Sequence, residues 1–520
     1  MTASPSSARI LTLPRLAILA LILVAVFFFR DTFLPTQSPY RSHSTSPSHL
    51  HAQPDQASHY ESESNTQDKS SSSGSTTTTT TTSTVHHATN NTTAADEPES
   101  CLSVPGADNV LIMLKTGATE LYQKLPTHFM TTFTCVPHFM IFSDLAQNFA
   151  DIPIHDAIAP ISSHFRDHHE DFELYRKLQQ YQREGQNLHA LSGTGGWNLD
   201  KWKFLPMLHQ AFETAPAHIE WFVLMEADTS ISWTNLLQWL RTMDPQQPYY
   251  LGAQNIIGST TFAHGGSGVV ISRRAADLLE TKRSTLGKTH YDSLWESTTS
   301  TSCCGDEIVA RAFLDVDVPL TPAWPLIQGE TVRTIDWKPD HWCTVALTWH
   351  HVTPIEIDML FQFETAWIAA HGWHTPYLYR DVFDHFIQRH ISVNRTAWNN
   401  LSQDRRFVLP FLPRTRGEDP PTPFDQLQDF EQDAVRSQDA CVEACSRHRK
   451  CLQWMFHPQG RCYLGEVMRF GGSDEGREWE RENSAGGAGD GEGHWVAGWM
   501  QERVQRFRDG LEGCEVRWHG

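Results

Sequence analysis

Four short apolar runs, separated by longer polar stretches, most limit the fold that this chain can adopt. The runs cover residues 109–114, 139–142, 221–225 and 269–272. Each run has the length and composition of a buried strand. Helix-compatible segments lie between or after them, at 169–184, 234–241 and 273–280. This alternation predicts an α/β domain with a largely parallel sheet, in which ligands bind at the carboxyl ends of the strands.

The third run leads directly into two carboxylates, Glu226 and Asp228, with one residue between them. Such a pair emerges at the sheet edge on one side of the chain. Carboxylate oxygens suit Mg²⁺ or Mn²⁺, which in turn bind diphosphate oxygens and neutralise a departing diphosphate. The structural alternative is a carboxylate that caps the next helix with help from Thr229.

Three later features carry candidate chemistry, each with a structural alternative. Gly265 and Gly266 lie in a glycine-rich stretch that permits close approach of a ligand, or is a plain loop. Asp306 precedes an apolar helical pattern, as a general base or an N-cap would. His350 and His351 follow an apolar stretch and suit a metal site, although such a pair is often structural.

The N-terminal segment predicts a membrane anchor. Residues 16–29 are an unbroken apolar run, and with 10–14 the stretch approaches the roughly 20 residues that a bilayer core demands. Arg9 and Arg15 favour a cytoplasmic tail at 1–9, a signal anchor at 10–30 and a luminal remainder. The alternative is a cleaved signal peptide, but the run ends in Phe29 and Arg30, which is a poor cleavage site.

The segment after the anchor, 31–98, is rich in Ser and Thr and predicts a disordered, O-glycosylated stem. All ten cysteines follow residue 100, which favours disulfides in an oxidising compartment over scattered reduced thiols. The net charge of -20 argues against a nucleic-acid partner. Acceptor sequences for N-glycosylation begin at Asn90, Asn91, Asn394 and Asn400.

The C-terminal region differs in composition. Residues 401–435 include a Pro- and acid-rich stretch that predicts a linker. Four cysteines follow within 22 residues, at Cys441, Cys445, Cys451 and Cys462. This pattern resembles a PAN/apple module, a small disulfide-stapled fold that binds protein or carbohydrate, over 436–520. The alternative is a disulfide-closed tail with no binding role.

Taken together and in order, seven motifs resemble a known family. They lie at 115–117, 143–144, 196–204, 221–229, 264–268, 303–306 and 348–352. The sequence over about 109–364 resembles the Fringe-like glycosyltransferases of family 31, especially fungal relatives of core 1 β-1,3-galactosyltransferase. The resemblance implies a GT-A domain over 99–400 and a metal-dependent, inverting transfer that forms a β-1,3 linkage.

The resemblance also implies roles for individual residues. Asp228 and His350 match the metal ligands for Mn²⁺ or Mg²⁺, and Asp306 matches the catalytic base. The remaining matches are to the nucleotide-sugar site: Thr116, Ser143, Asp144, Lys201, Glu226, Asp228, Gly265 and Gly266. Glu226 departs from the family, which usually has Asp at this position.

The implied donor is a UDP-sugar, with UDP-galactose favoured, and the implied acceptor is a glycoprotein O-glycan such as GalNAc-O-Ser/Thr. The implied location is a Golgi or endoplasmic reticulum membrane, with the catalytic domain in the lumen. Two alternatives stay open: a non-catalytic cell-surface or lectin-like protein, and a transferase of a different UDP-sugar. The presence of Glu226, Asp228, Asp306 and His350 together in one chain favours the enzyme.

Overall fold

The computed structural model describes residues 100–193, 195–412, 421–474 and 493–518. The predicted tail, anchor and stem at 1–9, 10–30 and 31–98 lie outside the described residues. Of the helices within the described ranges, none has both the length and the apolar content needed to span a bilayer.

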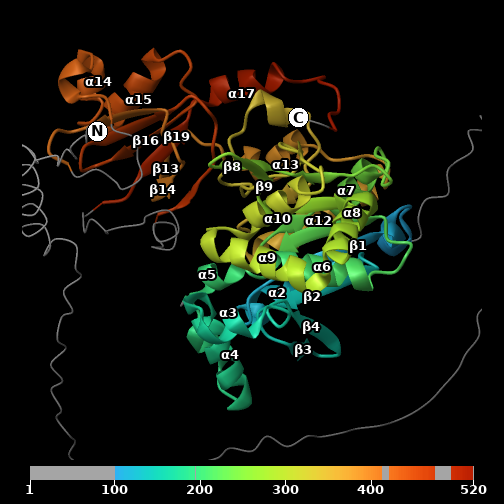
Figure 1. The fold of residues 1–520 in the computed structure, drawn as a ribbon. Helices are drawn as coiled ribbons and strands as arrows, with labels where there is room; N and C mark the ends of the chain where they lie inside the picture. The colour runs from blue at the N-terminus through green and yellow to red at the C-terminus, as the bar shows by residue number, and fades with distance from the viewer. Residues whose placement is uncertain (1–99, 194, 413–420, 475–492, 519–520) are drawn as a thin grey trace, which may run out of the picture. The chain divides into compact units, whose positions relative to one another are not determined.

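An eight-stranded mixed sheet organises the first part of the described chain, in the order β11-β7-β10-β5-β1-β2-β4-β3 (Figure 1). Its strands are β1 (Val110–Lys115), β2 (His138–Ser143), β3 (Gln147–Phe149), β4 (Ile152–Asp156), β5 (Trp221–Glu226), β7 (Tyr250–Gly252), β10 (Val269–Ser272) and β11 (Leu320–Pro322). The central strands β5, β1, β2 and β4 are parallel, whereas β10 runs antiparallel to both β5 and β7. The predicted α/β fold is therefore confirmed, with a sheet that is parallel at its centre.

The strand β1 shows why the short apolar runs form this sheet. Successive side chains of a strand point to opposite faces. Leu111 and Met113 enter one hydrophobic core, while Ile112 and Leu114 enter another on the opposite face. Because both faces are covered, the strand needs a continuous apolar run rather than an alternating one.

Helices cover both faces of the sheet (Figure 1). One core contains residues of α6, α8, α9 and α10. The other contains residues of α2, α7, α12 and α13. The helices of this region are α2 (Leu121–Met130), α3 (Ser163–His168), α4 (Glu173–Arg183), α5 (Gly196–Asp200), α6 (Phe204–Thr214), α7 (Trp233–Leu240), α8 (Arg273–Leu286), α9 (Lys288–Thr301), α10 (Gly305–Leu314), α11 (Pro339–Trp342), α12 (Pro354–His371) and α13 (Tyr379–Phe386).

Two small antiparallel pairs lie beside the main sheet. The pair β6 (Ser230–Ile231) and β12 (Thr348–Trp349) brings two distant segments together. The hairpin of β8 (Gln254–Ile257) and β9 (Thr260–Ala263) leads into the glycine-rich stretch at 264–268. Both pairs hold segments that carry candidate site residues.

The C-terminal region forms a separate five-stranded antiparallel sheet, in the order β13-β19-β16-β17-β15. Its elements are β13 (Arg395–Thr396), β15 (Arg405–Val408), β16 (Gln453–His457), β17 (Arg461–Gly465), β19 (Val496–Trp499), α14 (Asp429–Asp433), α15 (Gln438–Arg447) and α17 (Gln501–Asp509), with a side pair of β14 (Trp398–Asn399) and β18 (Gly472–Ser473). The segment predicted as a linker, 401–435, therefore holds β15 and α14. Phe407 of β15 is buried with the module's cysteines. The prediction of a linker was wrong here because it rested on the Pro-rich composition of neighbouring residues.

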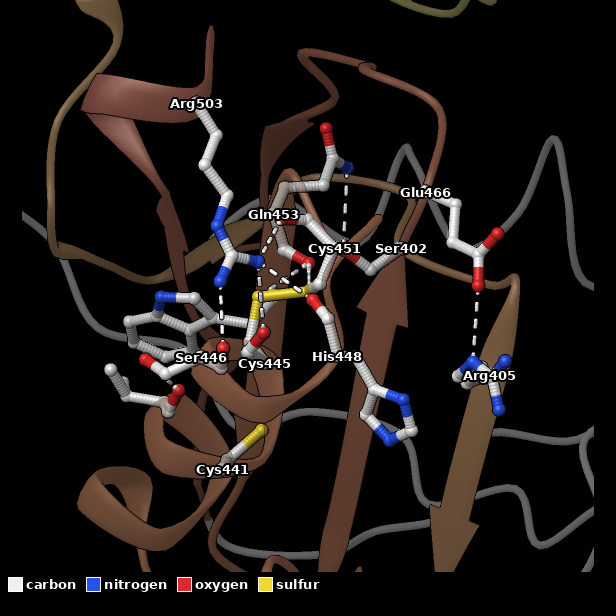
Figure 2. The surroundings of a disulfide bond; sticks show 12 residues. Ser402, Arg405, Cys441, Cys445, Ser446, His448, Cys451, Gln453, Glu466 and Arg503 are labelled. Carbon is white, nitrogen blue, oxygen red and sulfur yellow. Dashed lines mark hydrogen bonds and ion pairs between the residues drawn. A yellow bond between two sulfur atoms is a disulfide. The ribbon is translucent and has the colours of Figure 1, made fainter.

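Two disulfides hold the helix α15: Cys441–Cys462 joins it to β17, and Cys445–Cys451 joins it to the segment just before β16. Figure 2 shows Arg503 of α17 reaching the same place. Its guanidinium donates to the carbonyls of Cys445, Ser446, His448 and Cys451 at 2.7–3.1 Å. These carbonyls lie at and beyond the end of α15, where no further turn of helix satisfies them, so Arg503 acts as a C-cap from a distant helix.

The ten cysteines form five disulfides, which confirms the prediction of disulfides over reduced thiols. Cys101–Cys135 joins the segments that lead into β1 and β2, and Cys303–Cys304 directly precedes α10. Cys343–Cys514 ties the end of α11 to the C-terminal segment.

One predicted glycosylation site is buried. The side chain of Asn400 is fully inaccessible, and its amide donates to the carbonyls of Trp454 and Gly498. A glycan on this nitrogen is incompatible with the fold. The expectation for Asn400 is therefore wrong, because the sequence pattern carries no information on burial.

Candidate active site

The parallel strands β1 and β5 end side by side, and their last residues, Lys115 and Glu226, are register partners. Lys115 is buried, and its ammonium contacts the Asp200 carboxylate and lies 3.1 Å from Glu226 Oε1. Burial alone would lower the pKa of Lys115, but Asp200 and Glu226 outweigh it and raise that pKa. The edge of the sheet therefore holds a fixed positive charge between two carboxylates.

Asp228 lies in the turn after β5, between two nitrogen-bearing side chains. The His350 Nε2 is 3.5 Å from its Oδ1, and the Lys124 Nζ is 3.2 Å from its Oδ2. Burial by itself would raise the pKa of Asp228, but His350 and Lys124 hold that pKa well below its usual range. Asp228 is thus ionised at neutral pH, as a metal ligand must be.

The fold brings His350 to this turn from more than a hundred residues away. Strand β12, which ends at Trp349, pairs with β6 just after the turn, and the Val352 N–H donates to the Asp228 carbonyl at 3.1 Å. The His350 ring packs on Gly266, where an added Cβ would overlap it. A glycine at 266 is therefore a steric requirement of the His350 position.

The residues present fit a divalent cation. One ligand atom each from Asp228, His350 and His351 lies within 4.8 Å of the others. The His350 Nδ1 is buried with no hydrogen-bond partner, so this ring has coordinating capacity that the protein itself leaves unused. One carboxylate with two imidazoles suits Mn²⁺ and other borderline ions.

Asp306 faces the glycine-rich stretch from the first turn of α10. Its Oδ2 accepts from the Gly265 N–H at 3.1 Å, and its Oδ1 accepts from the Glu307 N–H at 2.9 Å. The helix N-cap is Cys304, so Asp306 does not fill that role. Burial raises the pKa of Asp306, in spite of the two N–H donors. A carboxyl held in this way gains basicity, which suits proton transfer.

The other nucleotide-site candidates from β1 and β2 lie in one buried network. Asp144 accepts from the Ala118 N–H at 2.7 Å and from the Ser143 hydroxyl at 3.3 Å, and it pairs with Lys203 at 3.3 Å. Lys203 also donates to the Thr116 carbonyl at 3.0 Å. The Thr116 Oγ1 is buried without a partner. Ser143 is committed to Asp144, whereas Thr116 retains a free hydroxyl.

Among the predicted nucleotide-site residues, Lys201 has a side chain whose polar contacts lie away from the others. Its Nζ lies 2.9 Å from Asp171 and 3.0 Å from the Ser302 carbonyl. The structure thus brings nine predicted residues to the carboxyl edge: Thr116, Ser143, Asp144, Glu226, Asp228, Gly265, Gly266, Asp306 and His350. Ion pairs through Lys115, Asp200 and Lys203 link Glu226 to Asp144. The polar contacts of Lys201 lie outside that network.

The sequence interpretation assigned no site role to six charged or imidazole residues of this edge, although all but Lys124 lie within its motifs: Lys115, Lys124, Asp200, Lys203, His264 and His351. A signal existed for Lys115, because a lysine directly after an apolar strand lies at the same edge as Glu226. No comparable signal marks Lys124, which comes from α2. Burial lowers the pKa of His264 to about 4, so its ring is neutral beside His350.

Comparison with known proteins agrees with this geometry. A family model described as Fringe-like matches residues 107–323. A search of curated proteins found no match. The Fringe-like family implies a glycosyltransferase, generally one that uses a UDP-sugar, and the mixed sheet fits a GT-A-like domain of that kind. The matched residues contain β1, β5, the Glu226–Asp228 turn and Asp306, whereas His350 lies beyond them.

Proposed function

We propose that this protein is a metal-dependent, inverting β-1,3-glycosyltransferase. In this proposal it transfers galactose from UDP-galactose to the 3-hydroxyl of an O-glycan such as GalNAc-O-Ser/Thr. The observation that carries the proposal is the meeting, at one sheet edge, of an ionised Asp228 beside His350 and a partly buried Asp306 of raised pKa. The Fringe-like match over 107–323 supports the same reaction class.

The residues divide the work between donor and acceptor. Lys115 and Lys124 place two ammonium groups at the edge, which favour a diphosphate there. Asp228, His350 and His351 would hold the divalent ion, which when bound neutralises negative charge on the departing diphosphate. Thr116 has an unpartnered hydroxyl for the nucleotide.

Asp306 accepts the proton of the acceptor 3-hydroxyl. As that O–H bond breaks, the oxygen forms a bond to the anomeric carbon, and the bond from that carbon to the UDP oxygen breaks. The electron pair leaves with UDP, and because attack comes from the opposite face, the anomeric configuration inverts. The Gly265 N–H holds one Asp306 oxygen at 3.1 Å and thereby fixes the carboxyl during the transfer.

The cellular setting and the C-terminal module complete the proposal. A signal anchor at 10–30 would retain the protein in a Golgi or endoplasmic reticulum membrane as a type II protein, with five disulfides formed in the lumen. The module around Cys441–Cys462 would act as a PAN/apple-like unit that contacts the glycoprotein acceptor.

Release of UDP by the purified luminal region tests the proposal. A panel of UDP-sugars is offered with GalNAc-O-Ser/Thr and other acceptors, in Mn²⁺ or in chelator. We expect metal-dependent release with UDP-galactose, and none with chelator. Release with another donor alone would correct the sugar and retain the reaction class.

Absence of release from every donor, with and without metal, would reject the transferase. That result would favour the lectin-like alternative. Binding of UDP, measured calorimetrically in Mn²⁺, separates an inactive preparation from a protein that has no nucleotide site.

A further inference from the structure

A second group of metal-ligand side chains lies at the opposite, amino end of the parallel strands. Asp108 lies two residues before β1, His138 is the first residue of β2, and His218 lies three residues before β5. These three strands are neighbours in the sheet, in the order β5-β1-β2. The parallel arrangement therefore gathers residues that are 30 and 110 positions apart in the chain, by subtraction of the residue numbers.

The three side chains converge on one point. The His138 Nε2 lies 2.8 Å from Asp108 Oδ1, and the His218 Nε2 lies 3.8 Å from Asp108 Oδ2. The two Nε2 atoms are 3.3 Å apart. A tetrahedral zinc ion, about 2.0–2.1 Å from each ligand atom, sets those atoms about 3.3 Å apart, in the middle of the observed range.

Hydrogen bonds within the cluster cannot account for both short contacts of the His138 Nε2. An imidazole nitrogen carries at most one hydrogen. If the His138 Nε2 donates its hydrogen to Asp108, it has none for His218 and no lone pair to accept one. If it instead accepts from His218, its contact with Asp108 joins two acceptors. A shared cation satisfies all three atoms at once.

We propose that Asp108, His138 and His218 form a second metal site, for Zn²⁺ or a similar imidazole-preferring divalent ion. The site clips the amino ends of β5, β1 and β2. The Cys101–Cys135 disulfide already joins the segments before β1 and β2, and the metal adds β5 to that connection. Asp108 and His218 are exposed, at 75% and 47% of the side chain, so the ion exchanges with solvent and water completes its coordination.

Zinc-dependent thermal stability tests this site. The luminal protein is stripped with chelator, and its melting temperature is measured against added Zn²⁺. We expect the melting temperature to rise with Zn²⁺, because the ion binds the folded state. His218→Gln and Asp108→Asn should each weaken the zinc dependence at least about 10-fold, since each removes one of three protein ligands.

His290→Gln is the matched control, because His290 is an exposed histidine on α9 far along the chain from this cluster. It should keep the wild-type response. Mn²⁺-dependent UDP release, measured in parallel, should be unchanged in all three variants. Unchanged release shows that a variant has lost zinc binding and has not misfolded. An equal zinc response in wild type, His218→Gln and Asp108→Asn would overturn the proposal, and so would a wild-type protein that does not respond to zinc.

Discussion

The two ends of the central parallel strands carry similar residue types in different environments. At the carboxyl edge, Asp228 and His350 are largely buried, and Lys124 forms an ion pair with Asp228. At the amino edge, Asp108 and His218 are exposed, and no lysine in the described part of the chain forms an ion pair with Asp108. A buried charge is stabilised only by a fixed partner, whereas an exposed one is stabilised by water. This difference in environment accords with the two proposals, in which the carboxyl edge carries the chemistry and the amino edge adds stability.

The largest expected effect on turnover comes from replacing Asp228, the proposed metal-binding carboxylate of the carboxyl edge. Asp228→Asn should lower Mn²⁺-dependent turnover by about 100-fold or more, because several kcal/mol of charge stabilisation depends on the ion. Initial rates of UDP release measure this loss. Asp277→Asn, at an exposed position of α8, is the control and should match wild type. Comparable rates for Asp228→Asn and Asp277→Asn would show that Asp228 contributes no more to turnover than an exposed surface carboxylate.

A steric variant should produce the next largest effect. Gly266→Ala places a Cβ against the His350 ring, so the ring must move, and we expect Mn²⁺ affinity to fall about 10- to 100-fold. Gly117→Ala, at the end of β1, meets only ordinary contacts at 3.6 Å and beyond. Titration of Mn²⁺ into both proteins compares them. Equal affinity would show that His350 does not hold the ion.

The pH dependence of turnover follows from Asp306. The base acts as a carboxylate, and burial raises its pKa above the ordinary aspartate value of 3.8. Activity should therefore be present at neutral pH and should disappear, as pH falls, at a higher pH than an exposed aspartate would give. Profiles of kcat/KM at saturating Mn²⁺ locate this acidic limb. An acidic limb at or below 3.8 would contradict the assignment.

The smallest expected effect lies at the amino edge. His218→Gln should change turnover by less than about 2-fold in Mn²⁺, because its contacts reach Asp108 and His138 and no residue of the carboxyl edge. Initial rates with saturating donor measure this directly. A loss as large as that of Asp228→Asn would mean that the two edges are coupled.

The sequence predicted the elements that local pattern determines. The predicted strands 109–114 and 221–225 match β1 and β5 to within one residue at each end. They could be predicted because a strand covered on both faces must be apolar throughout. Glu226, Asp228 and Asp306 were found because each follows or precedes such a pattern.

What the sequence could not predict depends on distant contacts. Lys124 pairs with Asp228, which lies 104 residues further along the chain. Lys203 likewise pairs with Asp144 from a distant part of the sequence. Part of the predicted linker forms β15, which pairs with β17. Asn400, a predicted glycosylation site, is buried. No local spacing encodes these contacts, because tertiary packing creates them.

The measurement that tests the central claim most directly is the turnover of Asp306→Asn beside its affinity for UDP in Mn²⁺. The side chain keeps its shape but loses its basicity, so the account predicts that turnover falls by about 10²- to 10⁴-fold while UDP affinity stays at the wild-type value. Turnover within a few-fold of wild type, with UDP still bound, would contradict the assignment of Asp306 as the base at the carboxyl edge.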